Sequence, residues 1–279
     1  MRLEQAIRQS REVLSTNNIE DAAIEAEVLL KHSLNLSRVD LYLQYTRELS
    51  SEEETRLQSL ITRRLAGEPA AYITGHREFY GLDFYVDKRV LIPRPESELL
   101  VDEGITSAEK GATTFADIGT GCGAIAVSLA VNLPYVRIYA TDISQEALEV
   151  GRINCRKHGV AGQVIFLQGD LLEPVPERVD IIIANLPYVC QAELTAVNTY
   201  GHEPELALAG GRDGLDEYRK LIPQVSQKLK PGGSLAIEIG QGQQSYVMSL
   251  LREFLPQGKV TVIPDLHGIP RTVILTVPV

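Results

Sequence analysis

The chain has 279 residues and a formal net charge of -10, so it is long enough to bury a sizeable core in one large domain and one small one. The negative charge opposes non-specific attraction to a phosphate backbone, so we expect a protein or small-molecule substrate and no direct nucleic-acid binding. The three cysteines, Cys122, Cys155 and Cys190, lie in no CxxC or histidine-rich context, which predicts neither a disulfide framework nor a metal site and fits a reduced, cytoplasmic location.

The N-terminal region has the pattern of a helical module. Its apolar residues recur at helical spacing, as in Leu57, Leu60, Ile61 and Leu65. Ser51 followed by Glu54 is a capping-box pattern that predicts the start of the last helix, and Gly67 with Pro69 predicts its end. No apolar run reaches the roughly 20 residues that a membrane span needs, so we expect a soluble protein without a membrane partner. These patterns predict a small all-helical domain over residues 1–75.

The pattern changes to short β-rich runs after this module. The stretch EFYGLDFYVDKRVLIPRP is aromatic, β-prone and interrupted by Gly81, which predicts a β-hairpin linker over residues 76–92. Further along, apolar runs alternate with helical segments: TTFADI, RIYATD, QVIFLQ, RVDIIIA and GGSLAIEI. This alternation predicts an α/β domain over residues 93–279 with a doubly wound, mostly parallel sheet, to which KVTVIPDLHGIPRTVILTV adds two antiparallel closing strands.

A glycine-rich turn follows the first strand of the predicted α/β domain. In ADIGTGCGAIAVSLA, Gly119, Gly121 and Gly123 fall between strand and helix, where the backbone can pass close to a ligand. Asp142, at the end of the next strand, is the expected acceptor for two ribose hydroxyls. Together they indicate an adenosine-containing cofactor. The turn also fits a G-x-G-x-x-A dinucleotide fingerprint through Ala124, so a nicotinamide enzyme remains an alternative here.

Polar residues also end the third and fourth strands. Asp170 follows FLQG, where it is either an adenine contact or a solvated carboxylate. In IIIANLPYV the apolar run ends at Asn185, which the topology brings to the same crevice. The order of DIGTGCG, TDIS and Asn-x-Pro-Tyr resembles the S-adenosylmethionine-dependent methyltransferases that modify planar amino or amide nitrogens.

The chemistry of amide methylation explains the residue types of this last motif. An amide nitrogen is a poor nucleophile because its lone pair is delocalised, unless acceptors hold its two N–H groups and align it. The Asn185 side-chain oxygen and the main-chain carbonyl of residue 186 are the two candidate acceptors. Pro187 biases residue 186 toward an extended conformation, and Tyr188 would flank the planar group.

The upstream segment narrows this resemblance to one family. GEPAAYITGHREFYGLDFYVDKRVLIPRPESELLVD, together with HEPELALAGGRDGLDEYRKLI after the Asn-x-Pro-Tyr motif, closely resembles the peptide chain release factor glutamine N5-methyltransferases. The resemblance implies S-adenosylmethionine as cofactor, release factors as protein partners recognised by the helical domain, and the Gln of their Gly-Gly-Gln loop as the methylated residue. It implies catalytic roles for Asn185, Leu186, Pro187 and Tyr188. It implies cofactor binding by Asp117, Gly119, Thr120, Gly121, Cys122, Gly123, Asp142, Asp170, Leu171 and Asn185.

Two positions depart from the family pattern. Leu186 stands where the family usually has Pro, as in the NLPY of ribosomal RNA adenine dimethyltransferases, and Ser97 stands where Thr is usual, which keeps a hydroxyl. The alternatives are therefore a glutamine methyltransferase for a ribosomal protein, an N6-adenine nucleic-acid methyltransferase, and a catalytically silent cofactor-binding module. The acidic charge and the linker favour the release factor enzymes over the nucleic-acid enzymes.

Overall fold

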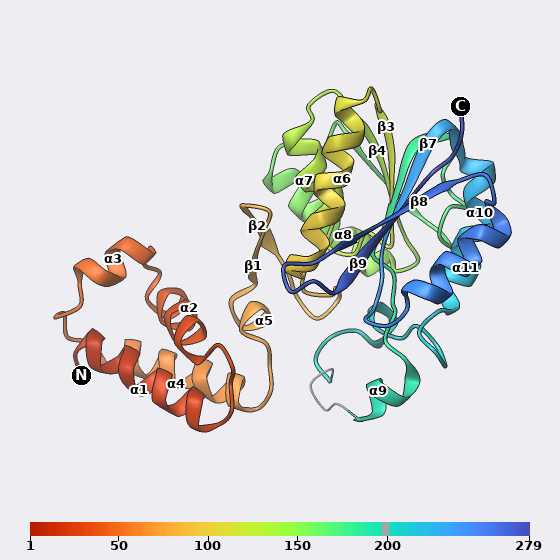
Figure 1. Cartoon of the computed structure of the whole chain (residues 1–279). Helices are drawn as coiled ribbons and strands as arrows, with labels where there is room; N and C mark the ends of the chain where they lie inside the picture. The colour runs from red at the N-terminus through yellow and green to blue at the C-terminus, as the bar shows by residue number, and fades with distance from the viewer. Residues whose placement is uncertain (197–200) are drawn as a thin grey trace. The chain divides into compact units, whose positions relative to one another are not determined.

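The structure, a computed structural model, describes residues 1–196 and 201–279, which form two compact units, Met1–His76 and Arg77–Val279. The first unit contains helices α1 (Leu3–Thr16), α2 (Ala22–Leu34), α3 (Arg38–Leu43), α4 (Ser51–Leu65) and α5 (Ala70–Thr74) (Figure 1). Leu14, Leu29 and Leu30 are among the fully buried side chains of its core. The prediction of a small all-helical N-terminal domain is therefore confirmed.

Helix α4 begins one residue before the position that the sequence pattern predicted. The capping box is formed by Ser50, whose Oγ accepts the Glu53 N–H at 3.2 Å, and by Glu53, whose Oε2 accepts the Ser50 N–H at 2.9 Å. The predicted pair of Ser51 and Glu54 is wrong, because the SSEEE tract offers two registers and Glu54 instead pairs with the N-terminal amino group. The predicted end is confirmed, since α4 ends at Leu65 and Gly67 takes the left-handed conformation at φ +97°.

A β-hairpin opens the second unit. Strands β1 (His76–Phe79) and β2 (Leu82–Tyr85) are joined by Tyr80 and Gly81, both with positive φ, the geometry that suits a two-residue hairpin turn. The buried side chain of Asn154 ties this hairpin to the glycine-rich turn: its Oδ1 accepts the Tyr85 N–H at 2.7 Å, and its Nδ2 donates to the carbonyls of Tyr85 and Cys122, both at 2.9 Å.

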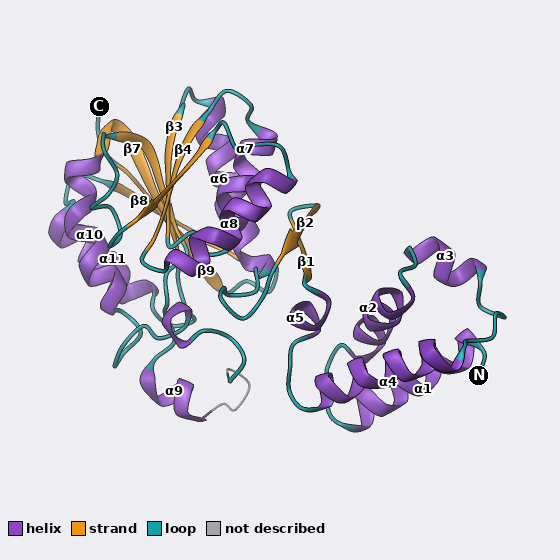
Figure 2. Ribbon diagram, turned by 180° about the vertical axis from the view of Figure 1, so that it is seen from behind, coloured by secondary structure: helices purple, strands orange, loops and turns teal. Residues whose placement is uncertain are grey.

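A seven-stranded sheet forms the centre of the second unit (Figure 2). Its strands are β3 (Thr114–Ile118), β4 (Arg137–Asp142), β5 (Val164–Gln168), β6 (Val179–Ala184), β7 (Leu229–Glu238), β8 (Lys259–Pro264) and β9 (Pro270–Thr276). Their order is β5-β4-β3-β6-β7-β9-β8, and only the pairs with β9 are antiparallel. The predicted doubly wound sheet with antiparallel closing strands is confirmed.

Helices cover both faces of this sheet. On one face lie α6 (Glu98–Glu109), α7 (Ala124–Asn132) and α8 (Gln145–Lys157), and on the other lie α10 (Asp216–Lys228) and α11 (Gln244–Phe254) (Figures 1 and 2). Shorter helices precede α6 and follow β6: η1 (Pro95–Ser97), α9 (Gln191–Ala196) and η3 (Glu205–Ala207). None of the helices in the described part of the chain combines the length and the apolar character that crossing a bilayer requires.

Candidate active site

Three strands end level with one another and define the position of the site. Ile118 at the end of β3 pairs with Thr141 of β4 on one side and with Ala184 of β6 on the other. The next residues along these parallel strands therefore lie at the same edge of the sheet. They are Gly119, Asp142 and Asn185.

Asp142 is held by the turn that contains the glycines. Its Oδ2 accepts the Gly121 N–H at 2.9 Å and its Oδ1 accepts the Ser144 N–H at 2.9 Å. Each carboxylate oxygen keeps a further lone pair, so two neighbouring hydroxyls can still donate to it. Burial raises the pKa of Asp142, and the N–H groups of Ser144, Gly121 and Ile143 oppose this rise. The carboxylate is thus fixed in position by the main chain before any ligand binds.

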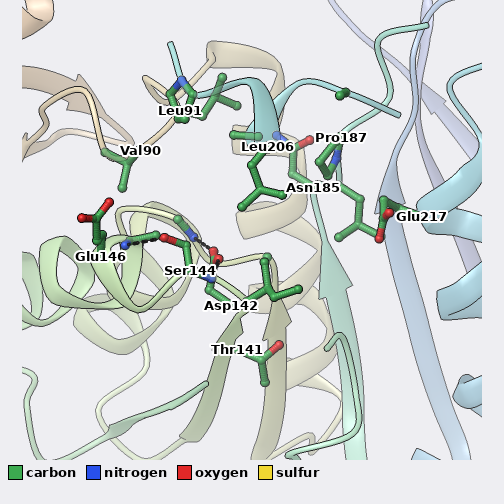
Figure 3. Close-up of a pocket in the computed structure, with 18 of the residues that line it drawn as sticks. Val90, Leu91, Thr141, Asp142, Ser144, Glu146, Asn185, Pro187, Leu206 and Glu217 are labelled. Carbon is green, nitrogen blue, oxygen red and sulfur yellow. Dashed lines mark hydrogen bonds between the residues drawn. The ribbon is translucent and has the colours of Figure 1, made fainter. Parts of the chain in front are cut away.

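A cavity of about 690 Å³ lies in front of these strand ends. This volume is in the range of small-molecule and cofactor sites, which is about 300–1,000 Å³. Figure 3 shows Val90, Leu91 and Leu206 facing Asp142 and Ser144 across the cavity. The charged side chains of its lining are the acidic Asp142, Glu146, Asp170, Glu205 and Glu217 and the basic Lys88, Arg89 and Lys220. Carboxylates therefore outnumber cationic groups in the lining.

Most of the residues singled out from the sequence meet in this cavity. Its lining includes Gly119, Gly121, Asp142, Asp170, Leu171, Asn185, Leu186 and Pro187. Five others of the described chain, Asp117, Thr120, Cys122, Gly123 and Tyr188, lie outside the lining. The first group lines the cavity, and the second group lies next to it in the sequence, in or beside the glycine-rich turn or, for Tyr188, on the NLPY segment.

The buried residues behind the glycines have supporting contacts. The Oδ2 of Asp117 accepts the Thr120 hydroxyl at 2.6 Å and the Ala126 N–H at 3.2 Å, which joins the turn to the first turn of α7. Burial raises the pKa of Asp117 to about 6 and that of the Cys122 thiol to about 12. Burial thus opposes ionisation of the Cys122 thiol, which disfavours a role for it as a nucleophile.

Hydrogen bonds orient the side chain of Asn185. Its Nδ2 donates to the Oγ of Ser97 at 2.8 Å, and the Ser97 hydroxyl donates to Oε2 of Glu238 at 2.5 Å. Tyr188 donates its hydroxyl to the other oxygen, Oε1, at 3.2 Å. Since Ser97 takes the nitrogen end of the Asn185 amide, Oδ1 remains as an acceptor for a ligand in the cavity.

Leu186 connects the glycine-rich turn to the strand that carries Asn185. Its side chain is only 3 % exposed, and a Cβ placed at Gly119 would lie 3.2 Å from Leu186 Cδ2. Gly119 also has φ +69°, so close packing and backbone conformation both require glycine there. The leucine thus holds the turn and the start of the NLPY segment together.

If the chain carries out the methyl transfer that the resemblance implies, we expect Leu186→Pro to keep its rate within a few-fold while lowering stability. Proline supplies the same main-chain carbonyl, but it leaves part of the Leu186 packing space empty, which costs about 1–2 kcal/mol in the free energy of unfolding. Single-turnover rates and urea unfolding measure the two effects separately. A stable but inactive Leu186→Pro variant would mean that NLPY has another site geometry, which would favour the nucleic-acid alternative.

Two walls of the cavity were not predicted from the sequence. One is residues 88–91, which follow the hairpin, and the other is residues 204–207, which follow the NLPY segment by some twenty positions. Glu203 joins them: its Oε1 accepts the Ile92 N–H at 3.0 Å and its Oε2 receives the Arg94 guanidinium at 2.5 Å. This ion pair is between residues more than a hundred positions apart, so no local pattern indicates it.

Comparison with known proteins identifies the class and then the family. The fold is that of the methyltransferases with a seven-stranded sheet, and it is similar to the crystal structure of a methyltransferase from Pyrococcus furiosus, with a TM-score of 0.54 and 19 % identity over 80 % of this chain and 98 % of that one. Residues 5–75 match the PrmC N-terminal domain and residues 96–200 match the methyltransferase small domain.

Two relatives extend this similarity over nearly the whole chain. The release factor glutamine methyltransferase of Moorella thermoacetica is 43 % identical over 96 % of both chains, and that of Koribacter versatilis is 39 % identical over 98 % of both. The chain belongs to the release factor glutamine methyltransferase family. The resemblance stated from the linker and the NLPY region is therefore confirmed.

Proposed function

We propose that the protein transfers a methyl group from S-adenosylmethionine to the side-chain nitrogen, N5, of the Gln in the Gly-Gly-Gln loop of peptide chain release factors, and that it does so in the cytoplasm. The observation that carries this proposal is the Oδ1 acceptor of Asn185 in the same cavity as the carboxylate of Asp142. The Asn185 oxygen suits a substrate amide, and the Asp142 carboxylate suits a ribose.

The residues of the cavity fit S-adenosylmethionine. Asp142 keeps acceptors for both ribose hydroxyls, and Gly119 and Gly121 present bare backbone to the cavity. Asp170 and Leu171 lie at the next strand end, on the side proposed for the adenine. When bound, S-adenosylmethionine supplies a methyl group on a positively charged sulfur, which takes the electron pair of the broken carbon–sulfur bond and becomes a neutral thioether. The surplus of carboxylates in the lining suits that positive charge.

The NLPY residues act on the substrate amide. The Oδ1 of Asn185 accepts one amide N–H and the main-chain carbonyl of Leu186 accepts the other, which places the nitrogen lone pair in line with the methyl group. As the new nitrogen–carbon bond forms, the nitrogen becomes acidic and loses one proton to water or to an acceptor. No strong general base is needed. Tyr188 contributes through its hydrogen bond to Glu238, behind the reacting atoms.

The charge of the cavity favours a protein substrate over a nucleic acid. Phosphates would meet five carboxylates in the lining and a chain of net charge -10. A competition assay tests this directly. An excess of a peptide that contains Gly-Gly-Gln should inhibit methylation of a release factor, and an equal excess of an adenine-containing oligonucleotide should not. Inhibition by the oligonucleotide alone, with methyl transfer to adenine, would replace the proposal by the nucleic-acid alternative.

We further propose that the helical domain over residues 1–75 recognises the release factor. Helix α3 exposes two apolar side chains, Val39 at 68 % and Leu43 at 78 %, which a protein partner would cover. Val39→Ser with Leu43→Ser should raise KM for an intact release factor at least about fivefold and leave KM for a short Gly-Gly-Gln peptide unchanged. Leu266→Ser, which changes a fully exposed leucine of the other unit, is the matched control. A KM for the intact release factor that stays at the native value, or that rises by the same factor as the peptide KM, would remove α3 from the contact.

A further inference from the structure

Glu238 is a buried carboxylate that the proposed reaction does not use directly. It ends strand β7 within the apolar run LAIEIG, and its residue is 1 % exposed. A charged group in such a place requires partners, because burying a carboxylate without hydrogen bonds is strongly unfavourable. Its partners lead to the NLPY motif.

The hydrogen bonds form a directed chain from Glu238 to the cavity. Both carboxylate oxygens accept a hydroxyl, Oε2 from Ser97 at 2.5 Å and Oε1 from Tyr188 at 3.2 Å. Ser97 is itself buried, at 4 % exposure, and has one proton to donate. Because that proton points to Glu238, the Ser97 oxygen offers only lone pairs to Asn185. It therefore selects the Nδ2 end of the Asn185 amide, at 2.8 Å.

We propose that Glu238 is a positioning residue: its ionised carboxylate orients the Ser97 hydroxyl, which holds the Asn185 amide with Oδ1 turned toward the substrate. The inference rests on the proposed function only in the role given to that oxygen. It extends the site by two residues, Ser97 and Glu238, neither of which lines the cavity.

The hydrogen bonds between Glu238, Ser97 and Asn185 can also form with donors and acceptors reversed, and this second arrangement is inactive. A protonated Glu238 can donate its own proton to the Ser97 oxygen, which frees the Ser97 proton to turn toward Asn185. A donor at that position favours the Oδ1 end of the amide, so the Asn185 side chain turns by 180° and presents Nδ2 to the cavity. Two N–H donors, one from the substrate and one from Asn185, would then face each other. The protonation state of Glu238 therefore selects between a competent and an incompetent amide.

The groups around Glu238 place this change near neutral pH. Burial raises its pKa to about 7, the hydroxyls of Ser97 and Tyr188 and the Arg271 guanidinium lower it, and the Glu96 carboxylate raises it. Arg271 lies on the neighbouring strand β9 and also forms an ion pair with Asp265, with 3.2 Å between Arg271 Nε and Asp265 Oδ2. From α10, Tyr218 donates its hydroxyl to the main-chain carbonyl of Glu238 at 2.7 Å, so it contacts the backbone and not the carboxylate.

The raised pKa of Glu238 indicates that its ionised carboxylate does not stabilise the fold. The pKa in the fold, about 7, is above the ordinary 4.5. The folded state therefore binds more protons than the unfolded chain between these values, and the stability gained from the neutral form is lost as pH rises through about 7. The ionised form that orients Ser97 is the less stable one. Glu238→Gln should consequently unfold at the same temperature as the native protein at pH 8, or higher.

The test compares pH profiles of single-turnover methyl transfer at saturating S-adenosylmethionine and Gly-Gly-Gln peptide. In the native protein the rate should rise as Glu238 ionises. Glu238→Gln should lower kcat about tenfold or more at pH 8 and remove this rise, with the KM for S-adenosylmethionine unchanged. Ser97→Ala should likewise lower kcat at pH 8 and remove the rise with pH. Ser97→Thr, which keeps the hydroxyl, should retain both the rate and the rise. Tyr218→Phe is the control, since it removes a buried hydroxyl next to Glu238 and should leave the pH profile in place.

Two results would overturn the proposal. One is a folded Glu238→Gln variant with the native rate and profile. The other is a rate lowered by the same factor at every pH, which is the mark of a general structural defect. A readout without catalysis keeps this test separate from that of the function: nuclear magnetic resonance should show the Asn185 side-chain amide protons changing with the same pH midpoint as the Glu238 carboxyl carbon, and Ser97→Ala should abolish that coupling. Independent titrations of the two groups would refute the relay even if no methyl acceptor were found.

Discussion

Asn185→Ala is expected to lower the rate of methyl transfer by about a hundredfold or more, which corresponds to roughly 3 kcal/mol of transition-state stabilisation. The substitution removes the Oδ1 acceptor, while the Ser97 hydroxyl that holds the amide is left without a partner on that side. The loss should appear in kcat, because the acceptor aligns the amide nitrogen when it attacks and contributes little to the binding of the rest of the substrate.

Single-turnover methyl transfer with a Gly-Gly-Gln peptide measures this effect. Asn132→Ala is the matched control, because Asn132 hydrogen-bonds the Ser128 carbonyl within its own helix, α7, outside the cavity. Thermal unfolding and cofactor titration exclude a folding defect. A stable, cofactor-binding Asn185→Ala variant with a near-native rate would contradict the role of Asn185 as an amide acceptor.

Asp142→Ala should weaken S-adenosylmethionine binding by about 2–3 kcal/mol, or roughly 30- to 150-fold in Kd. Two effects add in this variant. The ribose hydroxyls lose a charged acceptor, and the N–H groups of Gly121 and Ser144 lose the carboxylate that fixes the glycine-rich turn. The side chain of Asp142 is only partly exposed, so water replaces it poorly.

Isothermal titration calorimetry with S-adenosylmethionine measures this Kd. Glu177→Ala is the control: Glu177 pairs with Arg137 at 3.0 Å at the start of β4, outside the cavity lining, and its loss should leave Kd unchanged. Native cofactor affinity in a folded Asp142→Ala variant would mean that Asp142 does not contact the cofactor.

The strand ends were predictable from the sequence because they depend on short-range patterns. The apolar runs before Asp142 and Asn185 indicate buried parallel strands, and such strands end at one edge of the sheet. The register of the sheet agrees with this expectation, since Thr141 and Ala184 both pair with Ile118. The sequence therefore predicted those residues of the site that lie at or directly after the end of a strand.

Contacts over long sequence distances could not be predicted in this way. Ser97 and Glu238 are 141 positions apart, and Arg94 and Glu203 are 109 apart, so only the folded chain pairs them. A local sign of Glu238 was available, because a carboxylate within the apolar run LAIEIG is unusual without a buried partner. The register of the α4 capping box failed for a different reason: the SSEEE tract supports two registers equally, and tertiary contacts decide between them.

The measurement that tests the account most directly is mass spectrometry of a purified release factor after incubation with the protein and S-adenosylmethionine. The account predicts one added methyl group, located on the Gln of the Gly-Gly-Gln loop, and none with the Asn185→Ala variant. An unmodified release factor together with a methylated ribosomal protein or oligonucleotide, or a methyl group on another residue of the release factor, would contradict it.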